Sequence, residues 1–355
     1  MPATPQSHLP ALTGFRFFLA IWVILHHLSG KGKMLDAHVR MLPECLQTLI
    51  SSGYLAVATF FVLSGFVLAR SYGSIRWNGP NLIRYAAARG ARVYPVYLLS
   101  LAILIPIIVE QLRPEHTGAL WSYALVLQGW MGRPVVNWNT PAWSLSCELF
   151  FYALFPLILI PLRRAGRWRF VIAAGAGFAL PFAFMWLRVP SDWKPVIHFS
   201  DFLMGIAASA AYDAITSRMA GQGWAFYGPG ALAGLAAIVA PTLFGPWWMQ
   251  DAALRVANAT VLTGLALGGG FPARALSTEL TVFLGKASYS MYILHVPLLW
   301  WFKRTWMYRS AALTVPVSAA VYIGGVIAVA AVVFRHVEEP WNRRIRDWVR
   351  TRTAC

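Results

Sequence analysis

Long apolar stretches follow one another along the chain, with short polar segments between them. A membrane-spanning helix needs about 20 apolar residues, and fewer where polar side chains face the interior of a helix bundle. On this basis the pattern predicts about ten membrane helices. They cover residues 12–29, 53–69, 93–110, 142–162, 170–187, 197–213, 224–243, 252–270, 285–302 and 312–334. The predicted fold class is therefore an all-α polytopic membrane protein.

One shorter apolar stretch, residues 119–131, determines the predicted topology. About 13 residues are too few to cross a bilayer as a helix, so we expect a re-entrant or surface segment there. With ten spans, both termini lie on the same side of the membrane. Most arginines and lysines, including the cluster at 163–169, then fall on that side. Because cytosolic loops collect these residues, we expect both termini in the cytosol.

The composition supports a membrane protein and excludes several other classes. Of the 355 residues, 58% are hydrophobic and only 12% are charged, which is too few charges for an ordinary water-soluble enzyme. A net charge of +17 would suggest nucleic-acid binding in a soluble chain, but positive cytosolic loops explain it here and no nucleic-acid-binding module is visible. The cysteines Cys45, Cys147 and Cys355 are too scattered for a disulfide framework or a metal site.

The chain is predicted to form a single membrane domain over 12–344, followed by a basic cytosolic tail over 345–355. The first apolar run contains Arg16 and lacks a small-residue cleavage site. It therefore predicts a retained first helix rather than a cleaved signal peptide. No internal repeat is visible.

The first predicted helix carries polar groups on one face. Arg16 and His27 are separated by ten residues, which places them within about 20° of one face and about 16 Å apart along the axis. His26 points about 100° away from His27. A charge inside the bilayer costs about 3 kcal/mol on insertion scales, so it needs a partner or a function. The structural alternative is a snorkelling arginine with two histidines near the outer boundary.

Two later helices carry further polar groups. Glu148 lies on a stripe with Ser144 and Tyr152, at i, i+4 and i+8 spacing, in an otherwise apolar helix. Tyr292 and His295 share a face of the ninth helix, at a depth similar to that of His27. A buried structural carboxylate and a core histidine bonded to a tyrosine are the alternatives to a functional cluster.

Arginines also collect where the third helix enters the membrane. Arg89 and Arg92 are neighbours on a helix face. They are equally consistent with positive-inside topology and with phosphate binding, because guanidinium groups match phosphate oxygens. Together the polar groups predict two levels, a cationic cytosolic mouth and a titratable cluster at mid to outer depth. The mouth consists of Arg16, Arg89, Arg92 and Lys286, and the upper cluster of His27, Glu148 and His295.

Three further features are interpreted as structural. Asp201 lies near an outer helix end, where it is expected to pair with His198. Glu338 and Glu339 follow the last helix and are expected to neutralise the arginines around them. Gly65, in the second helix, indicates close helix packing.

Six motifs in register resemble the membrane-bound acyltransferase family 3, and the resemblance extends over residues 12–344. The motifs are Arg-x10-His at 16–27, Phe-Phe-Val-Leu-Ser-Gly-Phe at 60–66, Arg-x-x-Arg with Tyr-Pro at 89–95, Trp-Ser-Leu-x-x-Glu-x-x-Phe-Tyr at 143–152, Ser-Tyr-x-x-Tyr-x-x-His-x-Pro at 288–297 and Glu-x-Pro at 338–340. Many members carry an acidic residue where this chain has Ala58, so no function is assigned to an acid there. We expect a stand-alone membrane domain, without the C-terminal esterase-like domain of some members.

The resemblance implies O-acyl transfer, in particular acetyl transfer, in the inner (cytoplasmic) membrane. The implied donor is cytosolic acetyl-CoA or another acyl-CoA, bound through its phosphates by Arg16, Arg89, Arg92 and Lys286. The implied acceptor is a hydroxyl of a carbohydrate, a lipid-linked glycan or a glycosylated metabolite. His27 is expected to act as the general base, and no metal is expected. The other expected catalytic residues are Glu148, which orients or shares a proton with His27, and Tyr292 and His295, which stabilise the oxyanion or hold the pocket.

Two other function classes remain open from the residues alone. Intramembrane arginine, glutamate and histidine suit a proton-coupled transporter or flippase of an anionic lipid or sugar equally well. The absence of a visible inverted repeat and the register of the six motifs favour the enzyme over this class. A structural or accessory membrane subunit would not need Arg16 and His27 on one helix face.

Overall fold

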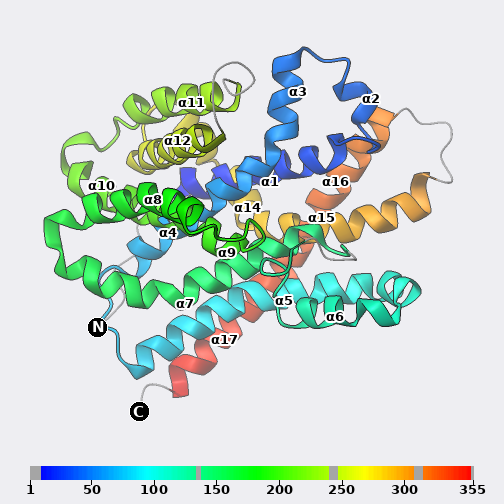
Figure 1. The fold of residues 1–355 in the computed structure, drawn as a ribbon, viewed down its shortest axis with the longest axis horizontal. Helices are drawn as coiled ribbons and strands as arrows, with labels where there is room; N and C mark the ends of the chain where they lie inside the picture. The colour runs from blue at the N-terminus through cyan, green and yellow to red at the C-terminus, as the bar shows by residue number, and fades with distance from the viewer. Residues whose placement is uncertain (1–8, 133–136, 240–246, 308–314, 353–355) are drawn as a thin grey trace. The chain divides into compact units, whose positions relative to one another are not determined.

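The structure is a computed structural model that describes residues 9–132, 137–239, 247–307 and 315–352. Every regular element in these ranges is a helix, as Figure 1 shows, so the predicted all-α fold class is confirmed. The predicted helix ends at 240–243 and 312–314, and Cys355, lie outside the described residues.

Each of the ten predicted stretches contains a helix. These helices are α1 (Pro10–Ser29), α4 (Leu55–Tyr72), α5 (Gly79–Gln111), α7 (Trp143–Arg164), α8 (Arg169–Trp186), α10 (Phe199–Met219), α11 (Trp224–Val239), α12 (Trp247–Leu267), α15 (Ser288–Phe302) and α16 (Val315–Val333). The shorter helices are α2 (Asp36–Val39), α3 (Glu44–Ser51), α6 (Thr117–Ala124), α9 (Lys194–Ile197), α13 (Gly270–Leu276), α14 (Glu279–Lys286) and α17 (Glu339–Arg352). Tight 3-10 turns precede several of them, at Ser52–Tyr54, Pro114–His116, Thr140–Ala142 and Gly166–Trp168, and wider π turns follow α15 and α16, at Lys303–Met307 and Phe334–Glu338.

Fewer of these helices than predicted are long and apolar enough to cross a bilayer. Within the described ranges there are six such segments, or seven if the bent pair Asp251–Leu267 and Gly270–Leu276 is one span. The six are Pro10–Ser29, Glu44–Tyr72, Gly79–Gln111, Thr140–Arg164, Arg169–Trp186 and Val315–Arg352. Among the others, α15 has 15 residues, and α10 carries Asp201, Asp213 and Arg218. The count of about ten spans and the cytosolic side of the termini stay predictions.

Helix α5 begins earlier than the apolar pattern predicts. It is 33 residues long and begins at Gly79, so it includes Arg84, Arg89 and Arg92, which precede the predicted start at residue 93. The side chain of Asn78 accepts a hydrogen bond from the amide of Asn81, and Pro80 lies in the first turn. Both are strong helix-start signals, but the polar first half of the helix has no hydropathy signal.

The stretch 119–131 does not form a spanning helix. Within it α6 ends at Ala124, after 8 residues, and turns follow it. A helix of that length rises only about 12 Å, less than half of a bilayer core.

The chain divides into two compact units. The first comprises Met1–Ser74, Leu157–Val189 and Ile197–Lys286, and the second comprises Ile75–Pro156, Pro190–Val196 and Ala287–Cys355. Each unit is assembled from segments far apart in the sequence, and each is described by itself below.

Small residues bring helices of the first unit into backbone contact. A Cβ on Gly65 of α4 would overlap the carbonyl oxygen of Phe202 on α10, and one on Gly205 would overlap that of Val62. The predicted close packing at Gly65 is therefore confirmed. Helices α11 and α12 of this unit lie side by side (Figure 1), and α1, α4, α10 and α12 share an apolar core.

The second unit is organised around α5, against which α15 and α17 both pack. Asn139, almost completely buried, connects two of these elements. Its amide donates to the hydroxyl of Ser100 on α5 and to the carbonyl of Ile293 on α15, both at 3.2 Å. A buried amide that is bonded on both sides fixes the register of the helices it joins.

Candidate functional site

In the second unit, a carboxylate and an arginine meet at one tyrosine. The hydroxyl of Tyr152 donates to Oε2 of Glu148 at 3.0 Å, both residues being on α7. The guanidinium carbon of Arg89, on α5, lies 5.6 Å from the centre of the Tyr152 ring. The Glu148 and Tyr152 part of the predicted polar stripe therefore lies beside Arg89 of α5. Tyr85 of α5 also bonds to the carbonyl of Tyr152, at 2.9 Å.

Arg92 lies one helical turn further along α5 and has a different carboxylate partner. Its guanidinium forms an ion pair with Glu338 and lies 5.0 Å from the ring centre of Tyr289. The other oxygen of Glu338 accepts a hydrogen bond from Ser290 at 2.7 Å. Glu338 is only 1% exposed. The expectation that it neutralises neighbouring arginines was wrong, because its partner is 246 positions away on another helix.

Tyr289 connects the two arginine sites. Its hydroxyl donates to the carbonyl of Val93 on α5 at 2.6 Å. The carboxylates of Glu148 and Glu338 and the guanidinium of Arg92 all lie within electrostatic range of this hydroxyl. The second unit thus holds a single cluster in which two arginines and two glutamates surround buried tyrosines. Such paired charges are characteristic of functional sites in membrane helices.

His295 is completely buried on α15, and its orientation is fixed. Its Nδ1 bonds to the carbonyl oxygen of Tyr292 at 2.7 Å. Because a carbonyl can only accept, Nδ1 carries the hydrogen, and Nε2 is the basic nitrogen of the neutral ring. The backbone of His295 accepts a bond from the hydroxyl of Tyr322 at 2.5 Å, and the hydroxyl of Tyr292 donates to Pro141 at 3.2 Å.

His27 of the first unit has the same arrangement on α1. Its Nδ1 bonds to the carbonyl oxygen of Val23 at 2.9 Å, one turn earlier in the helix. Nε2 is therefore the nitrogen that can accept a proton. His26 points elsewhere, as its spacing predicted, and its Nδ1 bonds to the carbonyl of Ser51 at 2.5 Å. His27 is half-buried.

Arg16 and Lys286 lie at the same end of a packed helix pair in the first unit. A Cβ on Gly285 of α14 would overlap the carbonyl oxygen of Thr13 on α1, so the two backbones touch there. Lys286 is the next residue of α14, and Arg16 follows three positions after Thr13. The two cations thus flank one contact between α14 and α1, and their common role stays a prediction.

The structure places the predicted site residues in two sets. Arg89, Arg92, Glu148, Tyr292 and His295 belong to the second unit, and Arg16, His27 and Lys286 belong to the first. The two-level arrangement joins residues of both units and stays a prediction. Within the part of the chain described here, no group of three or more histidines, cysteines or acids is placed to hold a metal ion.

The sequence reasoning missed a buried ion-pair network in the first unit. Asp201 of α10 bonds to His198 at 2.8 Å, as predicted, but it also accepts a bond from Nε of Arg255 at 2.9 Å. Asp201 and Arg255 are both less than 10% exposed. The signal was present as opposite charges in two apolar helices, but the sequence alone does not show which helices are neighbours.

Lys194 was also missed, because it lies in a short polar connection. Its ammonium group lies 4.3 Å from the ring centre of Trp143, the residue that begins α7. Its amide donates to the carbonyl of Gly129 at 3.0 Å. Burial lowers the pKa of Lys194, against the smaller opposing effects of Cys147 and Asp192. The start of the helix that bears Glu148 is therefore held by a cation–π contact.

Comparisons with known proteins agree on one family. Residues 9–335 match a family model described as an acyltransferase domain. The acyltransferase MdmB of Streptomyces mycarofaciens is 29% identical over 318 residues, which are 81% of this chain and 78% of that protein. The O-acetyltransferase OatA of Staphylococcus aureus is 25% identical over 166 residues, which are 43% of this chain and only 25% of that protein. Protein 2 in the picA locus of Rhizobium radiobacter is 49% identical over 181 residues, 44% of this chain. No solved structure matches.

Proposed function

The chain belongs to this acyltransferase family, and from that premise we propose that it is an O-acyltransferase whose donor is cytosolic acyl-CoA, in particular acetyl-CoA. The proposed acceptor is a hydroxyl of a carbohydrate, of a lipid-linked glycan or of a glycosylated metabolite, at or across the inner membrane. The apolar helices support a membrane location.

The proposed donor site uses the four cations expected from the sequence. Arg16 and Lys286 in the first unit, and Arg89 and Arg92 in the second, would bind the phosphates of CoA. The pairing of Arg92 with Glu338 does not exclude this role. A guanidinium has five N–H donors, more than one carboxylate can use.

The proposed general base is His27, and the observation that carries this role is the bond from its Nδ1 to Val23. That bond fixes the ring and makes Nε2 the basic nitrogen. In the reaction, Nε2 removes the proton of the acceptor hydroxyl while the hydroxyl oxygen attacks the thioester carbonyl. The C–S bond then breaks, and the proton passes from Nε2 to the departing sulfur, which gives the ester and free CoA.

Three residues of the second unit keep supporting roles in the proposal. Glu148, which accepts a bond from Tyr152, is the carboxylate that would orient or share a proton with the base. Tyr292 and His295 would stabilise the oxyanion or hold the pocket, and their fixed orientation suits either role.

The first test is calorimetric binding of acetyl-CoA to the protein in lipid nanodiscs. We expect weaker binding in Arg16→Ala and in the Arg89→Ala/Arg92→Ala double variant. The Arg76→Ala/Arg84→Ala double variant is the matched control, because both of these arginines are exposed and close to the same helix. No acetyl-CoA binding by folded wild-type protein would contradict the mechanism and favour the transporter class.

A second pair of variants tests the base. His27→Gln should abolish acyl transfer while acetyl-CoA binding stays largely intact. His26→Gln, at the adjacent position with its ring directed to Ser51, should retain activity. Loss of binding together with activity in His27→Gln would make His27 a structural residue instead.

A further inference from the structure

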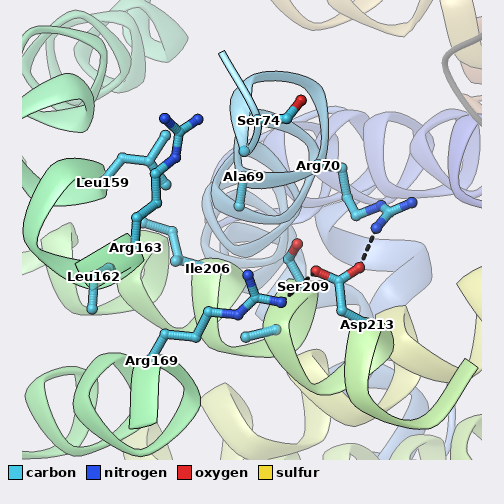
Figure 2. A pocket seen from close by; sticks show the side chains of 12 residues that line it. Ala69, Arg70, Ser74, Leu159, Leu162, Arg163, Arg169, Ile206, Ser209 and Asp213 are labelled. Carbon is cyan, nitrogen blue, oxygen red and sulfur yellow. Dashed lines mark hydrogen bonds and ion pairs between the residues drawn. The ribbon is translucent and has the colours of Figure 1, made fainter. Parts of the chain in front are cut away.

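A pocket in the first unit is lined by three arginines that the proposed mechanism does not use. It has a volume of about 310 Å³ and lies between α4, α7, α8 and α10 (Figure 2). Arg70 comes from the last turn of α4, Arg163 from the last turn of α7, and Arg169 is the first residue of α8. In Figure 2 these side chains extend from three different helices around the same space.

Positive charge exceeds negative charge in this pocket. Asp213 of α10 is the one acid among the twelve lining residues, and it pairs with both Arg70 and Arg169, the latter at 2.8 Å. Arg163 donates to the carbonyl of Tyr72 at 2.6 Å, which fixes the position of its guanidinium. Three guanidiniums with one carboxylate leave the lining two positive charges in excess. An anion is the ligand that such a lining favours.

The hydroxyls of Ser74 and Ser209 also line the pocket and can donate to an anion. Planar guanidiniums and hydroxyls together match the oxygens of a phosphate group. The lining also contains apolar side chains, among them Leu159, Leu162 and Ile206. The ligand that fits both kinds of lining residue is an amphiphile with a phosphate at its polar end.

The position of the pocket indicates where that amphiphile comes from. Arg70 and Arg163 lie in the last turns of two candidate membrane spans, and Arg169 begins a third. The pocket is therefore at a membrane boundary. Next to it, Leu157 and Ile160 of α7 and Phe170 of α8 expose apolar side chains, as helices in contact with lipid do.

We propose that the pocket of Arg70, Arg163 and Arg169 binds the phosphate headgroup of a membrane phospholipid, with the acyl chains along α7 and α8. Its volume is at the small end for ligand pockets, which suits a headgroup rather than a whole nucleotide cofactor. None of the residues proposed to bind CoA lines it. The lipid site is thus separate from the proposed donor site and goes beyond the proposed function.

Native mass spectrometry of the full chain in detergent tests the proposal, with phosphatidylglycerol and phosphatidylcholine as probes. The wild type should retain phosphatidylglycerol in preference to phosphatidylcholine. The Arg163→Gln/Arg169→Gln variant should bind phosphatidylglycerol about tenfold or more weakly, because it loses two charge-assisted contacts. The matched control is Arg164→Gln/Arg218→Gln, which removes the same charge from exposed arginines outside the pocket. It should bind like the wild type.

A second variant covers the case in which the double variant does not fold. Ser74 is exposed at the pocket, so Ser74→Asp adds a negative charge there without removing a contact of the arginines. It should also weaken retention of phosphatidylglycerol. Ser217→Asp, exposed on α10 outside the pocket, is its control. Equal retention by the wild type and Ser74→Asp would overturn the proposal.

Two competing sources of phosphate give distinct results. Inorganic phosphate that prevents retention of phosphatidylglycerol at equal concentration would assign the pocket to a soluble anion and overturn the lipid proposal. Acetyl-CoA binding should be unchanged in Ser74→Asp. A loss there would make this pocket the donor site and overturn the lipid proposal. Since lipid retention is measured without turnover, a failure of this proposal leaves acyl transfer untouched.

Discussion

Arg92 on α5 forms an ion pair with Glu338, which is almost completely buried. Removing one partner of a buried pair leaves an uncompensated charge, which costs about 3–5 kcal/mol. We therefore expect Arg92→Ala to lower the free energy of unfolding by about that amount. Denaturation of the purified protein by sodium dodecyl sulfate measures it.

The Arg92→Ala/Glu338→Gln double variant separates folding from donor binding. Because it removes both charges, it should regain most of the stability that Arg92→Ala loses. Acetyl-CoA binding should stay weak in the double variant, as in the single one. Recovery of binding together with stability would show that Arg92 acts only through the fold.

The pair between Arg255 and Asp201 gives a second stability prediction. Arg255→Ala should destabilise the first unit by about 3–5 kcal/mol, because Asp201 is then buried with only His198 beside it. Asp201→Asn should cost less, since Arg255 then keeps a second carboxylate, Asp251, at 3.9 Å. A double-mutant cycle measured by thermal denaturation gives the coupling between them, and a coupling near zero contradicts the assignment.

The bond from Tyr152 to Glu148 should matter for turnover. Tyr152→Phe keeps the ring beside Arg89 but removes the bond that orients the carboxylate. We expect kcat for acyl transfer to fall about tenfold, with acetyl-CoA binding unchanged. Tyr85→Phe is the control, because the hydrogen bond that it removes ends on the backbone carbonyl of Tyr152. Similar losses of kcat in both variants would indicate general loosening of α7.

A change at the contact between α14 and α1 should alter the position of Lys286, the residue after Gly285. Gly285→Ala introduces a methyl group that overlaps the backbone of Thr13, so the helices must separate. Overpacking of this kind costs about 1–3 kcal/mol, and the displaced Lys286 should weaken acetyl-CoA binding. Gly175→Ala on α8, where the methyl group meets nothing within 4 Å, is the matched control and should be neutral or stabilising. Calorimetry and thermal denaturation of both variants check this.

The sequence predicted well those features whose partners lie on the same element. The polar stripe of α7 followed from i, i+4 spacing, and the bond between Tyr152 and Glu148 confirms it. The pairing of His198 with Asp201 followed in the same way. Local spacing fixes such contacts because a helix has only one geometry.

Contacts between helices could not be predicted in this way. Glu338 is 246 positions from Arg92, and Arg255 is 54 positions from Asp201. Charge types and burial can be inferred from one sequence, but the choice of neighbouring helix depends on packing. The start of α5 was predicted wrongly for another reason. A helix segment outside the bilayer is polar, so the part of α5 before residue 93 lacks the apolar pattern from which the spans were predicted.

The two prolines inside α5 divide the helix mechanically. Pro95 and Pro106 have no amide hydrogen, so the hydrogen-bond ladder is broken at both positions. The segment between them is fastened, because Asn139 binds Ser100 and Trp301 binds the carbonyl of Ile103. The helical ladder therefore does not by itself hold the arginine-bearing part before Pro95 in line with the rest of α5, and the ion pair of Arg92 with Glu338 and the bond of Tyr289 to the carbonyl of Val93 fasten that part to its neighbours.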